Sequence, residues 1–71
     1  MSDIKFEIIE TLGVISTSSK GWTTEVNRVS WNDKPAKIDI RDWSPDHEKM
    51  GKGITLTDEE GQALKEILEN I

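Results

Sequence analysis

Basic and aromatic side chains alternate in the segment KIDIRDW, which covers residues 37–43. If this segment is a strand, Lys37, Arg41 and Trp43 share one of its faces, because side chains alternate along a strand. An indole ring stacks on an unpaired base, and cations follow the phosphates of a single strand. This face therefore has the chemistry expected of a surface that binds single-stranded nucleic acid.

The same spacing has a structural alternative. Trp43 could close the edge of the core, as aromatic residues at strand ends commonly do. Lys37 and Arg41 would then be ordinary surface cations that pair with Asp39 and Asp42. The spacing alone leaves both interpretations open.

More cations and indoles surround this segment. The sequence contains three Trp and no Tyr, and a thin-cored protein that keeps indoles beside turns is expected to offer them to a partner. The additional candidates for nucleic-acid contacts are Lys20, Trp22, Arg28, Trp31, Lys34 and Lys52.

The net charge of −5 taken alone argues against binding of nucleic acid, but the charges are unevenly distributed along the chain. Residues 1–19 carry one Lys and three acids, residues 20–53 carry seven basic and six acidic side chains, and residues 54–71 carry one Lys and five acids. The segment charges are therefore −2, +1 and −4. The acids gather towards the C-terminus, and all three Trp lie in the balanced middle.

The residue inventory favours a binding protein over an enzyme. His47 is the only imidazole, and neither a nucleophile elbow nor a phosphate-cradling glycine motif is present. With no Cys, the chain lacks the ligands of a structural zinc site, and its acids do not have calcium-loop spacing. We expect no catalytic residue, no metal and no cofactor.

Hydrophobic periodicity predicts four strands. Ile4, Phe6 and Ile8 alternate on one face of the first, and the phase slips between Ile9 and Gly13, which predicts a bulge. The second strand covers about residues 23–32, the third residues 36–43 and the fourth residues 53–56. Ile38 and Ile40 are expected on the core face of the third strand, opposite its cations.

A helix is predicted to follow from Thr57, because TDEE at residues 57–60 matches a capping box. Its apolar stripe consists of Leu64, Ile67, Leu68 and Ile71. The elements predict an α+β domain spanning residues 1–71, in which the helix packs on an antiparallel meander.

With 71 residues and no disulfide, the chain can build only a thin core. Self-association is the remaining source of stability, so the helix stripe is expected to form a homodimer interface. The N-terminus lacks a signal-peptide pattern, and no segment is apolar enough to cross a membrane. We expect a soluble, cytoplasmic protein.

Four segments together resemble the positive-cofactor-four family of transcriptional coactivators, most closely its short bacterial relatives of the YdbC type. The most specific are DIRDW at residues 39–43 and GKGITLT at residues 51–57. VSWN at residues 29–32 and QALK at residues 62–65 agree in spacing. The similarity extends over about residues 4–70.

The resemblance implies a curved four-stranded antiparallel sheet, a C-terminal helix, a homodimer and single-stranded DNA binding. It implies that Trp31 and Trp43 stack on bases and that Arg41 and Lys52 contact phosphates or bases. Lys34 resembles the family's turn lysine, whereas Lys20, Trp22 and Arg28 align less closely. The basic, serine-rich regulatory tail of the eukaryotic coactivators has no counterpart in this sequence, so coactivation is not implied.

Taken together, these patterns predict a homodimeric single-stranded DNA-binding protein with weak sequence preference, with RNA as a variant ligand. Trp31 and Trp43 would be its stacking platforms, and Arg41, Lys52, Lys37 and Lys34 would contact the backbone. Transcription, replication or repair machinery would be its setting. The alternative is a protein-interaction module whose Trp-bearing face docks a peptide or a polymerase subunit.

Overall fold

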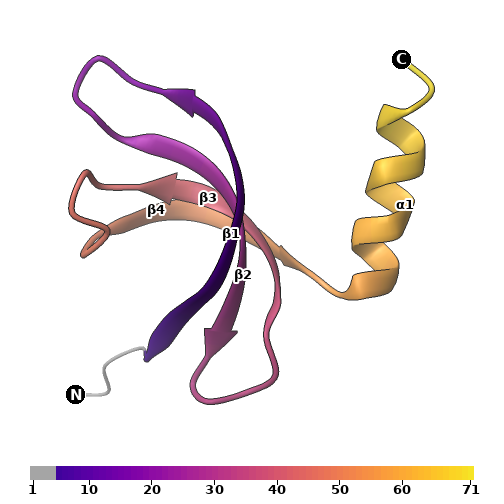
Figure 1. Cartoon of the computed structure of the whole chain (residues 1–71), viewed down its shortest axis with the longest axis horizontal. Coiled ribbons are helices and arrows are strands. Elements are labelled where there is room, and N and C mark those ends of the chain that lie inside the picture. The colour runs from indigo at the N-terminus through magenta and orange to yellow at the C-terminus, as the bar shows by residue number, and fades with distance from the viewer. Residues whose placement is uncertain (1–4) are drawn as a thin grey trace.

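A computed structural model describes residues 5–71 of the chain as a four-stranded sheet followed by one helix (Figure 1). The elements are β1 (Phe6–Thr17), β2 (Thr23–Trp31), β3 (Lys37–Trp43), β4 (Met50–Leu56) and α1 (Asp58–Leu68). Neighbouring strands are antiparallel and follow the order β1-β2-β3-β4. The predicted α+β meander is confirmed.

β1 is a long edge strand that bends repeatedly. Its register against β2 shifts between Ile8 and Glu10, between Thr11 and Gly13, and between Val14 and Ser16. The first two shifts cover the segment where the alternation slips, so the predicted bulge is confirmed. The expected place of Ile4 on this strand lies outside the described residues.

β4 is longer than its apolar pattern predicted, because it begins at Met50 rather than at Gly53. Trp43 of β3 pairs with Met50 and Arg41 pairs with Gly53, with a bulge between the two pairs. Backbone pairing with β3 thus extends the strand to residues that do not show the alternating apolar pattern of a strand.

The capping box of α1 is present as predicted. The Glu60 amide donates to Thr57 Oγ1 at 3.1 Å, and the Thr57 amide donates to Glu60 Oε1 at 2.8 Å. The helix ends at Leu68, with Glu69 as its C-cap. Ile71 therefore follows the helix and does not continue its stripe. No helix within residues 5–71 is long and apolar enough to span a membrane.

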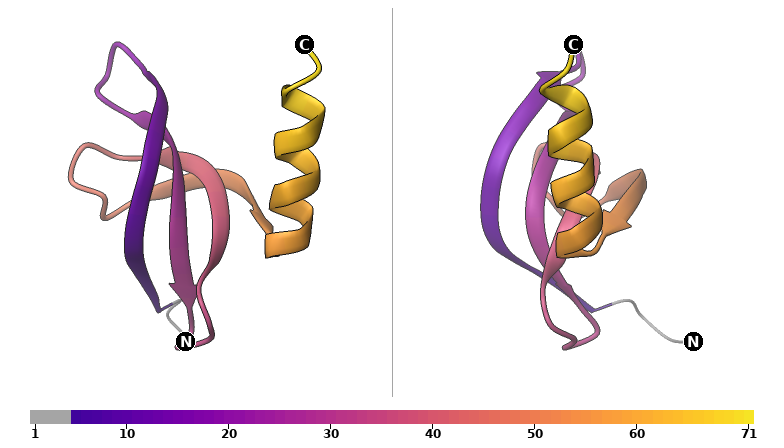
Figure 2. Two further views of the ribbon diagram at one scale, coloured as in Figure 1. Left: turned by 45° about the vertical axis from the view of Figure 1, so that its right-hand side comes forward. Right: turned by 90° about the vertical axis from the view of Figure 1, so that its right-hand side faces the viewer.

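The sheet is strongly curved (Figure 2), and its two faces differ. We call the face that carries the odd-numbered side chains of β2 and β3 the odd face, and the opposite one the even face. The odd face buries Val29 and Trp43, together with the polar residues Glu25, Asn27 and Asp39. These are, with Ser44, the buried side chains of residues 5–71.

The face assignment predicted for β3 was wrong. Ile38 and Ile40, on the expected core face, are only half-buried, whereas Asp39 and Trp43, on the expected open face, are fully buried. The physical reason is curvature: Phe6 and Trp43 come from opposite ends of the odd face, and their ring centroids are 5.2 Å apart. Because the sheet curves towards its odd face, the side chains of that face bury one another, and no second layer of helices or strands within residues 5–71 covers them.

The even face meets α1 only loosely. Ile38 approaches the helix at Gly61, and an apolar groove of about 540 Å³ separates the sheet from the helix. α1 has no buried residue, and Ile67 and Leu68 are 63% and 53% exposed. The groove is lined by Ile15, Val26, Ile38, Ile40, Leu56, Gly61, Leu64, Lys65, Leu68 and Glu69.

Candidate nucleic-acid interface

Arg41 lies on the odd face, between Asp39 and Trp43 along β3 and opposite Glu25 of β2. Its Nε donates to Asp39 Oδ2 at 2.6 Å and its Nη2 donates to Asp39 Oδ1 at 2.8 Å, so the pair is bidentate. Nη1 also lies 3.6 Å from Met50 Sδ. The guanidinium is thereby held in one orientation, with the side chain of Arg41 15% exposed.

Trp31 meets this guanidinium from the far end of β2. The Arg41 Cζ atom lies 4.7 Å from the centroid of the Trp31 ring, which is a cation–π arrangement. Phe6 contacts the same indole, with the ring centroids 6.0 Å apart and the planes tilted by 46°. Trp31 remains half-buried, so part of the indole is open to a ligand.

Trp43 has a structural role, which corrects the expectation that it is a stacking platform. Its side chain is fully buried, and its ring lies against Phe6 and stacks on His47 with centroids 5.7 Å apart. An indole with no exposed surface cannot stack on a base. The structural alternative for Trp43 therefore holds, and so does the pairing of Arg41 with Asp39.

Beside Trp43, a buried carboxylate anchors the β3–β4 loop. Glu25 is 4% exposed and lies 2.8 Å from His47 Nε2, through its Oε2 atom. Asn27 Nδ2 donates to Glu25 Oε1 at 3.1 Å, and the Thr23 hydroxyl donates to Oε2. Burial disfavours the charged form of Glu25, but these hydrogen bonds and the His47 contact outweigh burial and lower its pKa.

Several lysines around the odd face carry unneutralised charge. Lys37 is exposed and shares the odd face with Arg41 through the register of β2 and β3. Lys34 is exposed in the β2–β3 turn, and Lys52 is exposed in the β3–β4 bulge. None of the three forms an ion pair with another residue of the described part, 5–71.

The structure does not bring Arg28 to this surface. Arg28 lies on the even face, where its guanidinium forms ion pairs with Glu10 at 3.7 Å and with Asp58 at 3.3 Å. Lys20 and Trp22 lie in the β1–β2 turn, the first exposed and the second half-buried. Arg28 is therefore separate from the Trp31–Arg41 pair, and Lys20 and Trp22 precede β2, at the end of that strand opposite to Trp31.

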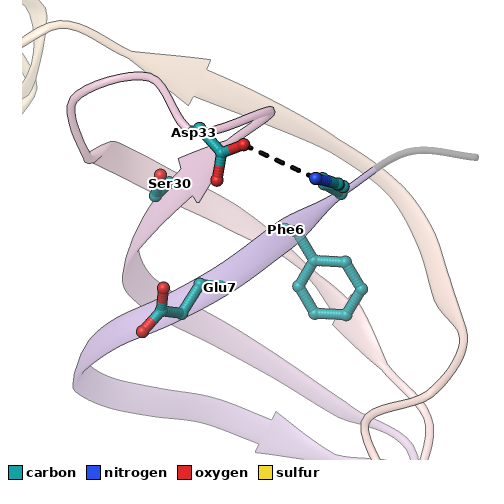
Figure 3. A pocket seen from close by; sticks show the side chains of 5 residues that line it. Phe6, Glu7, Ser30 and Asp33 are labelled. Carbon is teal, nitrogen blue, oxygen red and sulfur yellow. Dashed lines mark ion pairs between the residues drawn. The ribbon is translucent and has the colours of Figure 1, made fainter.

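A small pocket of about 330 Å³ lies where β1 begins (Figure 3). Its cation Lys5 is 3.7 Å from Asp33, and Glu7 and Ser30 also line it. The Phe6 ring points away from the Lys5–Asp33 pair. Because its acids outnumber its one cation, this pocket does not suit a phosphate.

Phe6 and Glu25 adjoin this site but were not among the candidate residues of the sequence, whereas Asp39 was named there only as a partner for the cations of its strand. Asp39 stands two residues before Arg41 on one strand face, and this spacing was a usable signal for the ion pair. Phe6 contacts Trp31 and Trp43 because the sheet is curved. The local sequence does not predict this curvature.

The curved antiparallel sheet and the C-terminal helix define a small α+β domain, and one face of its sheet carries an indole covered by a guanidinium. The family described as Transcriptional Coactivator p15 (PC4) matches residues 18–67, and this chain belongs to it. The predicted resemblance is confirmed at the level of the family. An uncharacterized protein of Treponema pallidum (strain Nichols) is 48% identical over 69 residues, which cover 97% of this chain and 81% of the relative.

Proposed function

We propose that this protein is a homodimer that binds single-stranded DNA with little sequence preference on the odd face of its sheet. Membership of a family that binds single-stranded DNA supports this function. The observation that carries it is the half-buried Trp31 with the Arg41 guanidinium 4.7 Å above its ring, close to lysines without ion-pair partners.

Weak sequence preference follows from the groups that a base would meet. Stacking on an aromatic ring tolerates every base, because each base has a π face. The polar side chains that could read base edges, Glu25, Asn27 and Asp39, are buried beneath the odd face. They also bond to neighbouring side chains, so they are not free to discriminate between bases.

The phosphates would be contacted by Lys34, Lys37 and Lys52. Each is exposed, and none has its charge neutralised within residues 5–71. The acids of α1 lie on the element that flanks the even face, so they do not line the route of the strand over the odd face. This separation reconciles a net charge of −5 with an anionic ligand.

A second copy of the chain is the occupant we propose for the even-face groove. The two buried apolar side chains among residues 5–71 are Val29 and Trp43, both on the odd face. The apolar side chains of the even face and of α1 are therefore not buried in the single chain. A chain of this size needs further burial of apolar surface to be stable. Leu64, Ile67 and Leu68 would form the helical part of the interface, and Ile71 would extend it.

We place this activity in the cytoplasm, on single strands that transcription, replication or repair exposes. Binding by stacking and ion contacts needs no cofactor and no catalytic residue. One observation favours a second candidate, a protein-interaction module: the groove is strongly apolar and open. In that case a peptide or polymerase subunit, rather than a second copy, would fill it.

Fluorescence titration with oligo(dT) tests the proposed function, because Trp31 reports directly on stacking. We expect strong quenching at micromolar protein, weak displacement by a duplex of equal length, and no need for added metal. If a duplex competes as well as the single strand, binding does not involve base stacking and is only electrostatic. No quenching would favour the protein-interaction module, and tighter binding of oligo(rU) than of oligo(dT) would make RNA the ligand.

A further inference from the structure

Arg41 is held in a way that is unusual for a side chain expected to contact phosphates. Two of its nitrogens are bonded to both oxygens of Asp39, and its side chain is 15% exposed. A phosphate contact gains affinity by releasing counterions, which requires a cation whose charge is not already neutralised. The carboxylate of Asp39 removes most of that contribution.

The carboxylate of Asp39 is itself held in place by burial and by a further hydrogen bond. It is fully buried, and it accepts a third hydrogen bond from Thr55 Oγ1 at 3.0 Å. Separating a buried ion pair leaves an uncompensated charge and is strongly unfavourable. Arg41 therefore cannot leave Asp39 for a phosphate at low cost.

The same ion pair determines where the guanidinium plane lies. With Asp39 holding its inner edge, the group is positioned above the Trp31 ring at 4.7 Å. Guanidinium planes, like aromatic rings, stack on unpaired bases, and Arg supplies this planar surface where Lys does not. The guanidinium over the indole therefore offers a base a second planar group next to the Trp31 ring.

We propose that Arg41 and Trp31 form one composite stacking platform, in which Arg41 contacts a base through its plane, and that Asp39 is the positioning residue of this platform. The inference rests on the proposed binding of single-stranded DNA. It changes the expected role of Arg41 from a backbone contact to a base contact.

Arg41→Lys separates the two roles, because it keeps the charge and removes the plane. For a composite platform, affinity for oligo(dT) should fall roughly ten-fold, with the slope of log affinity against log salt unchanged. For a phosphate contact, Arg41→Lys should bind like the wild type, and Arg41→Ala should reduce the slope by about 0.7. Lys37→Ala is the matched control, since removal of a true phosphate contact should reduce the slope.

Asp39→Asn tests the positioning role. It keeps the side-chain volume but releases the guanidinium, so we expect weaker binding of oligo(dT). If Arg41 were instead a phosphate contact whose charge Asp39 neutralises, Asp39→Asn would bind more tightly and show a steeper salt slope. Should this variant fail to fold by circular dichroism, Thr55→Val removes one hydrogen bond that holds Asp39 in place and leaves its charge. We expect weaker binding of oligo(dT) with an unchanged salt slope, and wild-type affinity would count against the positioning role.

A measurement without DNA completes the test. In a Trp22→Phe background, Trp31 is the remaining half-buried indole, since Trp43 is fully buried. Arg41→Lys should then increase acrylamide quenching of fluorescence, and unchanged quenching would overturn the stacked arrangement. If the wild type does not bind oligo(dT), the proposed function fails and this inference with it. Wild-type binding that Arg41→Lys leaves intact overturns the composite platform alone.

Discussion

Phe6 and Trp43 lie against each other with ring centroids 5.2 Å apart, although they stand at opposite ends of the curved sheet. Phe6 also contacts Trp31, so one phenyl ring connects the buried indole with the half-buried one. This relationship explains how a single sheet layer buries Trp43 with no second layer above it. It also divides the two indoles by role, with Trp43 supporting the odd face and Trp31 open to ligand.

Trp43→Ala should therefore unfold the domain rather than remove a ligand contact. Truncation of a buried Trp typically costs about 3–5 kcal/mol, which is a large share of the stability of a small domain. Urea unfolding followed by circular dichroism measures the loss. Trp22→Ala is the control and should cost less, because Trp22 is only half-buried in a turn. A folded Trp43→Ala protein with normal stability and lost DNA binding would contradict this account.

Ile67→Asp tests the proposed dimer. Ile67 is 63% exposed in the single chain, so the substitution would change the stability of a monomer by about 0.5 kcal/mol or less. In a dimer it places an unpaired charge in an apolar interface, and the subunits should dissociate or unfold. Sedimentation at micromolar concentration measures the mass.

Gln62→Asp is the matched control for that experiment. It adds the same charge to the same helix at an exposed position that does not line the even-face groove. This variant should sediment like the wild type. A wild-type mass near 8.0 kDa would show that the protein is a monomer and would leave the groove to another partner.

The stability of the domain should decrease in acid because of Glu25. Its pKa is lowered in the folded state from an ordinary value of 4.5, so the folded protein binds this proton less readily than the unfolded chain. The stabilisation is therefore complete above about pH 4.5 and is lost as pH falls through the lowered pKa. Urea unfolding across this range should show Glu25→Gln with a smaller pH dependence than the wild type.

Glu48→Gln removes an exposed carboxylate from the same loop as His47 and serves as the comparison for the acid experiment. Its stability should follow the wild-type curve. An equal pH dependence in the wild type and Glu25→Gln would show that Glu25 is not the group responsible.

Gly53→Ala should be destabilising, because a Cβ at this position would lie 2.2 Å from Arg41 Cβ and 2.4 Å from the Ile40 carbonyl oxygen. The backbone of β3 or β4 would have to move, and overpacking of this kind costs about 1–3 kcal/mol. Gly13→Ala is the matched control, since its Cβ would meet nothing within 4 Å. Thermal unfolding compares the two. Equal melting temperatures for both variants would contradict the close approach at Gly53.

Local signals were sufficient to predict the elements of this fold. The capping box at Thr57 and Glu60 marks the start of α1 by itself, and the broken alternation after Ile8 marks the bulges of β1. Alternation also shows which side chains of β3 share a face. It does not show which face is covered, because that depends on curvature and on contacts such as Phe6 with Trp43. Alternation thus grouped Lys37, Arg41 and Trp43 on one face of β3, as the structure has them, but it left open whether Trp43 is buried there and it did not predict the contact of Trp31 with Arg41.

The central claim is that single strands bind by stacking at Trp31, and the affinity of Trp31→Ala for oligo(dT) over a series of salt concentrations tests it most directly. We predict a loss of about 1–3 kcal/mol in binding free energy and an unchanged salt slope, because an indole releases no counterion. Circular dichroism must show the wild-type fold. A folded Trp31→Ala protein that binds oligo(dT) as tightly as the wild type would contradict the account.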